Sequence, residues 1–394
     1  MHSSQQYKTA GEISAKALKK VISLAQPGAK LLELAEAGDK ELTAGCASVY
    51  NNKKNMPKGI SFPTSVNVNN VIANFSPLPI NLPAPAASSE DGAAAKENGA
   101  SSNASTSAQQ ELKSGDILKI QLGAHIDGYA SIIGETIVVG SDSVTGPAAD
   151  LIKAVKTAEE VALRVMKPGA TNFEVAKAIE NAIKEFGPGI KPVEGMQSNL
   201  MDKDIIDGKK KIVVQPEPAQ RPDACKIEAD EVYGIDLHVT TSAEGKPKVG
   251  LYPTTIYKKT GSTYLLKMAT SRKVFSEIAR KAGAFPFSIG SILPVEELPR
   301  ARMGVQECVT HGLVAPFEVQ YDAAGSLTAG VFFTIATNDK GAIRLSPENP
   351  GGWYSADKIK SEKEIKDEKL KELLAQPVRQ NKKTRKAAAA ASKA

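Results

Sequence analysis

The feature that most constrains the fold is a short pattern that occurs twice. PGAKLLELA begins at Pro27 and PGATNFEVA begins at Pro168, so both copies read PGAxxxExA at an offset of 141 positions. Each copy ends one helical pattern and begins another, and Ala17 in the first half matches Ala158 in the second. A repeated helix–turn–helix unit predicts a pseudo-twofold fold, with helices from both halves packed on a shared sheet.

Residues 118–140, LKIQLGAHIDGYASIIGETIVVG, are predicted to form two strands joined by a tight turn at residues 125–128. Asp-Gly between apolar runs is a strong hairpin signal. With those four residues as the loop, Gln121 faces Ile132. Opposed side chains on one sheet face lie close enough to share an ion. Two carboxylates would form a metal site there, but this chain has an amide and a hydrocarbon.

The remaining elements follow from periodicity and capping signals. A helix is expected from a capping box at Thr9 to Pro27, and a second from about Lys30 to Val49. In the second half, Thr171 to Glu174 is a capping box for a helix that ends near Gly187. Further strands are expected at about 211–214, 231–240, 253–257, 315–321 and 327–337, and further helices at 262–282, 298–311 and 355–376. Strands and helices are mixed with hairpins, which indicates an α+β fold with a mainly antiparallel sheet.

Composition narrows the class of protein. Hydrophobic residues make up 41% of the 394 residues, which is enough for a core, and no apolar run is long enough to predict a membrane span. The first residues are polar, so we expect no signal peptide, and we expect residues 1–8 to be disordered. Cys46, Cys225 and Cys308 form no CxxC pair, which argues against disulfides and zinc fingers. Residues 80–110 are rich in Ala, Ser and Asn and are expected to form a disordered loop.

The net charge of +6 equals the charge of the acid-free C-terminal tail, which we expect to be disordered from residue 377 to residue 394. Its cations are Arg379, Lys382, Lys383, Arg385, Lys386 and Lys393. The tail is either a solubilising or nuclear-localisation segment, or a phosphate-binding arm; we favour the arm.

A second cationic segment, residues 258–281, has one acid, Glu277. We expect Leu265, Met268, Val274, Phe275 and Ile278 to face the core and the cations to face outward. An ordinary solvated helix mixes both signs, so this imbalance suggests phosphate contact, with a plain charged face as the alternative. The cations are Lys258, Lys259, Lys267, Arg272, Lys273, Arg280 and Lys281.

Few residues have the pattern of a catalytic site. His2, His125, His238 and His311 show no HExxH or other ligand spacing, and we interpret them as structural. No GxSxG, phosphate loop or dinucleotide fingerprint is present. Asp236 is the exception, because a carboxylate in a largely apolar strand needs a partner or a raised pKa. It is either a remnant metal ligand or a structural carboxylate, and the structural interpretation is favoured.

Several segments together resemble the type 2 methionine aminopeptidases, and more closely their non-peptidase relatives, the proliferation-associated or curved-DNA-binding proteins. The segments are SFPTSVNVNN, LKIQLGAHIDGYASIIGETIVVG, DEVYGIDLHV, TSRKVFSEIARKAGAFPF and ARMGVQECVTHGLVAPFEV. The resemblance implies the pita-bread fold: a curved sheet with helices on its convex side and pseudo-twofold symmetry. It would span residues 9–376, with a helical insertion at about 258–315.

The resemblance also implies that a metal site has been lost. The peptidases of this family hold two metal ions with two Asp, one His and two Glu. Here Gln121 and Ile132 stand at the Asp positions, Ser198 at the His position, and Asp236 and Phe332 at the Glu positions. Asn74 stands where the peptidases have a substrate-binding His. We therefore expect no metal, no cofactor and no catalysis, because these residues do not supply the charge that holds two divalent ions.

The function implied is binding of structured RNA, foremost the rRNA of the large ribosomal subunit near the tunnel exit, in ribosome biogenesis and translation. Nuclear, nucleolar and cytoplasmic residence and binding of curved DNA are compatible with it, and no membrane partner is expected. Two alternatives remain open. The emptied pocket could bind a protein partner, or the chain could be an active aminopeptidase with a different ligand set around Asp236 and His238.

Overall fold

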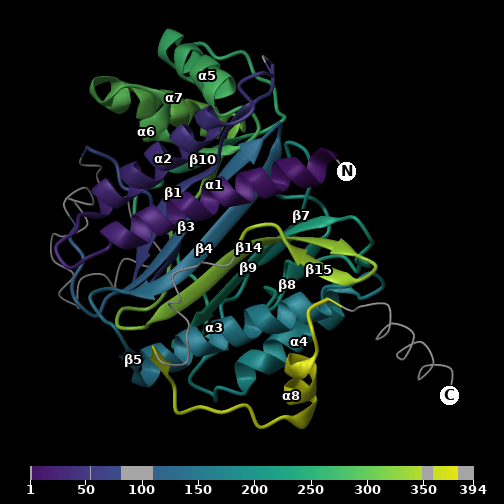
Figure 1. The fold of residues 1–394 in the computed structure, drawn as a ribbon. Helices are drawn as coiled ribbons and strands as arrows, with labels where there is room; N and C mark the ends of the chain where they lie inside the picture. Colours follow the sequence, from purple (N-terminus) through teal and green to yellow (C-terminus); the bar gives the residue numbers. More distant parts are fainter. Residues whose placement is uncertain (1, 54, 81–109, 348–357, 380–394) are drawn as a thin grey trace.

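The computed structural model describes residues 2–53, 55–80, 110–347 and 358–379. The predicted loop at 80–110 and the tail beyond Arg379 therefore lie almost wholly outside the described residues. Two helix pairs cover one face of a large, mainly antiparallel sheet, and a smaller helical subdomain lies at one end (Figure 1). Among the described helices, none has the length and apolarity that crossing a bilayer requires.

The central sheet has nine strands, and its main path is β1-β3-β4-β14-β9-β7-β8. β15 pairs with β14, and β6 pairs with β9. The bounds are β1 Lys58–Val68, β3 Ile117–Ile126, β4 Tyr129–Val138, β6 Lys191–Pro192, β7 Gln197–Met201, β8 Lys211–Val213, β9 Val232–Thr240, β14 Thr328–Asn338 and β15 Gly341–Arg344. Short strands outside it are β2 Val71–Ala73, which pairs with β13 Gln320–Tyr321, and β5 Val144–Thr145, which pairs with β16 Ile359–Lys360.

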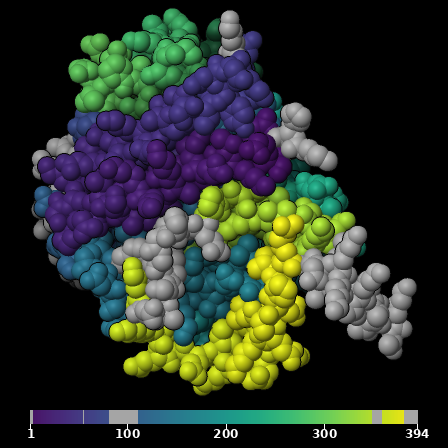
Figure 2. All heavy atoms as spheres, in the orientation of Figure 1, coloured from purple at the N-terminus to yellow at the C-terminus, as the bar shows by residue number. Residues whose placement is uncertain are grey.

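Each half of the sheet has its own helix pair. Helices α1 (His2–Leu24) and α2 (Leu31–Ser48) pack on β1, β3 and β4, and α3 (Gly146–Val165) and α4 (Asn172–Lys184) pack on β14, β9 and β8. Two separate apolar clusters lie beneath the pairs, one per half. Figure 2 shows that α1 and α2 form a continuous layer on this side of the molecule.

The duplication predicted from the two Pro-Gly-Ala triplets is confirmed by matching backbone hydrogen bonds. The amide of Gly28 donates to Leu112 O at 2.7 Å, and the amide of Gly169 donates to Ile227 O at 2.9 Å. Both glycines have positive φ, 87° and 94°, which a side chain would disfavour. The capping box at Thr171 is also present. The strand order from β1 to β7 is therefore symmetric about the β4–β14 pair.

Three predicted helix boundaries were wrong because tertiary contacts override local signals. Helix α1 begins at His2 rather than Thr9, since buried Tyr7 packs against Tyr129 with ring centroids 5.2 Å apart. Helix α5 (Ala269–Lys281) begins seven residues later than predicted, and Arg272 holds the preceding segment by donating to Leu266 O and Lys267 O. Helix α8 covers Glu368–Ala375 alone, because the chain before it pairs through β16.

The hairpin is present, but its register differs from the prediction by two residues. Asp127 and Gly128 form the whole loop, with φ of 56° and 82°, so Ile126 pairs with Tyr129. Positive φ at both central residues is typical of the two-residue turns that Asp-Gly favours. As a result, Gln121 pairs with Gly134, and Ile132 pairs with Gly123.

The insertion subdomain, residues 256–317, has its own sheet and its own apolar cluster. The sheet order is β11-β10-β12, formed by β10 Ile256–Lys259, β11 Pro286–Ser288 and β12 Val314–Phe317. Its helices are α5, α6 Ile289–Ile292, the 3-10 turn η2 Val295–Glu297 and α7 Leu298–Thr310. The expected insertion at 258–315 falls within these residues. Stacking of His125 on Phe285, with centroids 4.2 Å apart, joins it to the hairpin.

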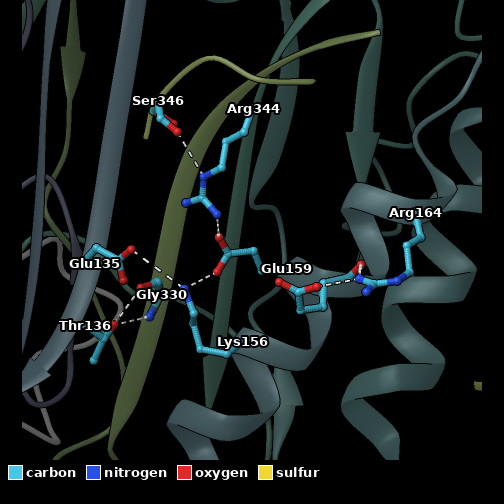
Figure 3. Close-up of polar contacts among 9 residues, drawn as sticks. Glu135, Thr136, Lys156, Glu159, Arg164, Gly330, Arg344 and Ser346 are labelled. Carbon is cyan, nitrogen blue, oxygen red and sulfur yellow. Dashed lines mark hydrogen bonds and ion pairs between the residues drawn. The ribbon is translucent and has the colours of Figure 1, made fainter. Parts of the chain in front are cut away.

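A buried ionic network ties the second helix pair to the sheet (Figure 3). Glu159 on α3 contacts both Lys156 and Arg344, and Lys156 Nζ also lies 3.8 Å from Glu135 Oε1 on β4. Burial alone would raise the pKa of Glu159, but the charges of Lys156 and Arg344 lower it. The carboxylate is therefore ionised, and the network links α3, β4 and β15.

Candidate functional site: a central pocket and a cationic insertion

Five of the six residues predicted to line a vestigial pocket do line one cavity. Asn74, Gln121, Ile132, Asp236 and Phe332 border a space of about 380 Å³ beneath the insertion. Gln121 and Ile132 are not directly opposed, as the register shift shows, yet both reach the same face diagonally. Five of the predicted residues thus lie around one cavity, although the predicted hairpin register was wrong.

Two large apolar side chains occupy the inner part of this site. A Cβ at Gly123 would lie 2.7 Å from Ile132 Cγ1, and a Cβ at Gly234 would lie 2.8 Å from Phe332 Cζ. Only glycine at these strand positions leaves room for the two side chains. Phe332 pairs with Asp236 across β14 and β9 and with Gly134 on β4, so its side chain lies at the centre of the sheet.

Ser198 does not line the cavity, because its hydroxyl bonds to the backbone. Ser198 Oγ accepts from the amide of Asp236 at 2.9 Å and lies 3.3 Å from the carbonyl oxygen of the same residue. Asn74 has a positive φ of 69° and donates through Nδ2 to Glu318 O at 3.0 Å. Both side chains therefore have structural partners that a metal ligand would have to give up.

A histidine lies next to Asp236. His238 Nε2 lies 2.8 Å from Asp236 Oδ1, without forming a hydrogen bond, and both side chains are largely buried. His238 also borders a very small cavity together with Lys119. Lys119 Nζ donates to Asn69 O and Thr328 O, and burial lowers its pKa well below the ordinary value. Asp236 thus lies beside one imidazole, and its assignment as a structural carboxylate stays a prediction.

These residues do not fit a two-metal centre. Such a centre needs several anionic or imidazole ligands converging on one space, and here Asp236 is the single acid among the six positions. No group of three or more His, Cys, Asp or Glu side chains able to hold a metal occurs in the described ranges. Ile132 and Phe332 place hydrocarbon where ligand oxygens would be needed.

Comparison with known proteins assigns the lineage. The model of metallopeptidase family M24 matches residues 5–203. The curved DNA-binding protein of Schizosaccharomyces pombe is 41% identical over 96% of this chain and 91% of its own length. The chain belongs to metallopeptidase family M24. Within that family, it is one of the proliferation-associated and curved-DNA-binding relatives of the methionine aminopeptidases.

Solved structures of the M24 family show the same fold. A thermophilic Arx1 has 31% identity and a TM-score of 0.83, covering 97% of this chain and 99% of that one. The methionine aminopeptidase of Rickettsia prowazekii has 13% identity and a TM-score of 0.51, covering 88% and 97%. The fold is therefore the pita-bread fold that the resemblance implied.

Fewer cations of the insertion are free to contact phosphate than the sequence suggested. Lys258 pairs with Asp207, Lys273 with Glu297 and Arg280 with Glu277, and Lys281 donates to the carbonyl oxygen of Ile292. The partners at Asp207 and Glu297 lie outside the segment, so sequence counting missed them.

Other insertion residues form the exposed cationic surface. Lys267 and Arg272 are exposed and make no ion pair within the described chain, and Lys259 is half-buried. Arg300 and Arg302 on α7 add to this surface and were not predicted, since they lie outside the lysine-rich run. The expected core positions Leu265 and Met268 were wrong: they are 86% and 45% exposed, and Leu266 is buried instead.

Of the predicted tail cations, the structure describes Arg379, which forms an isolated bridge with Gly341 beside β15. Lys382, Lys383, Arg385 and Lys386 lie outside the described residues. Two of the histidines interpreted as structural, one at the hairpin and one in the insertion, stack on aromatic rings. Burial against Phe285 lowers the pKa of His125 to about 4, and His311 stacks on Tyr264 with centroids 3.6 Å apart.

Proposed function

We propose that this M24 protein is a non-catalytic member of its family that binds structured RNA, foremost the rRNA of the large ribosomal subunit. It would act in ribosome biogenesis and translation near the tunnel exit, in the cytoplasm, the nucleus and the nucleolus. Binding of curved DNA would use the same phosphate contacts. The name of the Schizosaccharomyces pombe relative, a curved DNA-binding protein, supports contact with nucleic acid.

The observation that carries the proposal is the charge of the insertion subdomain. Residues 258–317 contain nine Lys or Arg and four acids. Two of the acids, Glu277 and Glu297, pair with cations, and a third, Glu307, borders a groove. Lys267, Arg272 and Arg300 remain exposed on adjoining elements. Clustered, unneutralised cations on one subdomain are the electrostatic footprint of phosphate binding.

Exposed apolar side chains on the same subdomain favour a mixed RNA and protein surface. Tyr264, Leu265, Met268, Val295 and Met303 are half of the ten most exposed large apolar residues in the described chain. Met268 and Met303 border a groove of about 680 Å³. Apolar groups gathered in one region indicate a macromolecular contact, and a ribosome offers both RNA and protein there.

The tail would form a second, separate contact. In Figure 1 the insertion lies at the top of the molecule and α8, which precedes the tail, lies at the bottom. An extended nucleic-acid surface could reach both. Arg379, Lys382, Lys383, Arg385 and Lys386 would contribute phosphate contacts whose strength falls steeply with salt.

Co-sedimentation with purified large ribosomal subunits across a salt series tests the proposal. The variant Lys267→Glu/Arg272→Glu/Arg300→Glu should lose most pelleting, and a chain ending at Gln376 should be weakened but still pellet. Each lost phosphate contact should reduce the slope of log affinity against log salt by about 0.7–0.9. The matched control is Lys8→Glu/Lys19→Glu/Lys20→Glu on the exposed face of α1, which should pellet like the parent.

The control separates surface-specific binding from a loss of total positive charge, because both triple variants change the net charge equally. Equal weakening of the two would mean that binding is non-specific. Full retention of pelleting by the insertion variant would contradict the proposed interface.

A further inference from the structure

The central pocket that Gln121, Asp236 and Phe332 border has charged and aromatic walls. The proposed binding of nucleic acid makes no use of it. Phe62, Phe317 and Phe332 contribute three aromatic rings, and the first two meet edge to face with centroids 6.0 Å apart. A volume of about 380 Å³ is within the range of ligand-binding cavities. Such walls suit a ligand that has an apolar stem and a polar or charged end.

The charge of the lining is one-sided. Asp207, Asp236 and Glu318 border the cavity, and among the described residues that line it there is no Lys, Arg or His. Lys258 already pairs with Asp207 from outside, at 2.5 Å. Asp236, which His238 approaches to 2.8 Å from behind the lining, and Glu318 at the rim are the carboxylates next to which a ligand cation could lie.

The two carboxylates differ in depth. The side chain of Asp236 is 14% exposed, whereas Glu318 is an exposed residue at the rim. Buried acceptor atoms without a hydrogen-bond partner in the described chain, Asn199 Oδ1 and Gln320 Oε1, add further negative potential to the lining. A cation next to Asp236 would be poorly screened by water, and the aromatic faces would attract it as well.

We propose that the pocket binds the ε-ammonium group of a lysine side chain presented by a partner protein. The unbranched methylene stem would lie against the aromatic rings and the ammonium would meet Asp236. An α-amino group is less suited, because two substituents branch from the carbon beside it, and Ile132 and Phe332 fill the inner part of the site. This inference does not depend on ribosome binding.

Ligand titration of the full-length chain tests the inference on the unmodified protein. The probe is Nα-acetyl-lysine N-methylamide, followed through the methyl signals of Ile132 and Met196, which line the cavity. We expect saturable shifts with a dissociation constant of about 1 mM, as for a weak small ligand. The norleucine analogue, which lacks the ammonium, and the Nε-acetyl analogue should each bind at least about tenfold more weakly.

Variants of the two carboxylates add a second, independent comparison. Asp236→Asn keeps the side-chain shape and should weaken probe binding by about tenfold. Glu318→Gln removes the same charge at the solvent-exposed rim and should weaken it by less than about twofold, because water and salt screen that position. Thermal unfolding of both variants checks that the fold is retained, and both should co-sediment with ribosomal subunits like the parent.

Three results would overturn the inference. Equal binding of the norleucine analogue would mean that the pocket recognises the apolar stem and not the ammonium group. Tighter binding of methioninamide, which has a free α-amino group, would mean that the pocket binds the amino terminus of a chain instead of a lysine side chain. Absence of any shift at about 10 mM probe would mean that it does not bind this cation.

Discussion

The two halves of the molecule share one backbone plan and differ in the polar groups that secure it. Gly28 and Gly169 make corresponding backbone bonds, to Leu112 and Ile227. In the first half, the neutral hydroxyl of Ser14 connects α1 to β3 and β4. In the second half, the ionic network around Glu159 connects α3 to the sheet. Main-chain pairing therefore fixes the frame, and side-chain chemistry can differ within it.

The same difference recurs in the pocket. Leu112 corresponds to Ile227, and counting nine residues onward from each leads to Gln121 on β3 and Asp236 on β9. These residues occupy related positions, and again the first half is neutral and the second is charged. The pocket is thus asymmetric in charge within a symmetric arrangement of strands.

The largest expected effect comes from breaking the charged connection. Glu159→Ala leaves Lys156 and Arg344 without their buried carboxylate partner, and should lower the free energy of unfolding by about 3–5 kcal/mol. The neighbouring pair of Glu160 and Arg164 is partly exposed, so Glu160→Ala should cost less than about 1 kcal/mol. Urea unfolding measures both. Similar costs for the two variants would mean that the buried network stabilises the fold no more than an exposed ion pair does.

The neutral connection should cost less to break. Ser14→Ala leaves the buried amide of Ala124 without its acceptor, 3.0 Å away, and should lower the free energy of unfolding by about 1–3 kcal/mol. Ser23→Ala removes an exposed hydroxyl from the same helix and should change stability by less than about 0.5 kcal/mol. If Ser14→Ala cost as much as Glu159→Ala, charge would not distinguish the two connections.

The third contrast is a pH dependence of stability that has opposite sign in the two halves. Burial raises the pKa of Asp39 on α2 from 3.8 to about 6, against the lowering effect of its hydrogen bond from the Thr64 amide. Between these values the folded chain keeps a proton that the unfolded chain releases. Stability from this group is therefore lost as pH rises through the window, by at most about 3 kcal/mol. Glu159, whose pKa is lowered, loses its contribution as pH falls instead.

Unfolding midpoints from pH 4 to pH 7 test that sign. Asp39→Asn removes the titration, so its stability relative to the parent should rise with pH and level off above about pH 6. A parallel shift of parent and variant at every pH would show that Asp39 does not titrate in this window.

Local signals predicted the frame well, and long-range contacts explain what they missed. The Pro-Gly-Ala turns and the Asp-Gly hairpin depend on backbone conformations that neighbouring residues dictate. The start of α1 depends on Tyr7 reaching Tyr129, which no capping signal encodes. Arg344 and Glu159 are 185 positions apart, and nothing in one sequence pairs them. The pocket residues were predicted through family resemblance, whereas the partner of Lys258, Asp207, and the position of His238 next to Asp236 required the structure.

Because β10 pairs with β12, most of the insertion could be replaced by a short turn. Lys259 lies opposite Val314, so the chain leaves the main body and returns to it through adjacent strands. A two-residue Asn-Gly turn matches the twist of two such strands and could replace residues 260–313. The shortened protein would keep the pocket and lack the cationic surface. The proposed nucleic-acid contact could in this way be removed from the scaffold that holds the pocket.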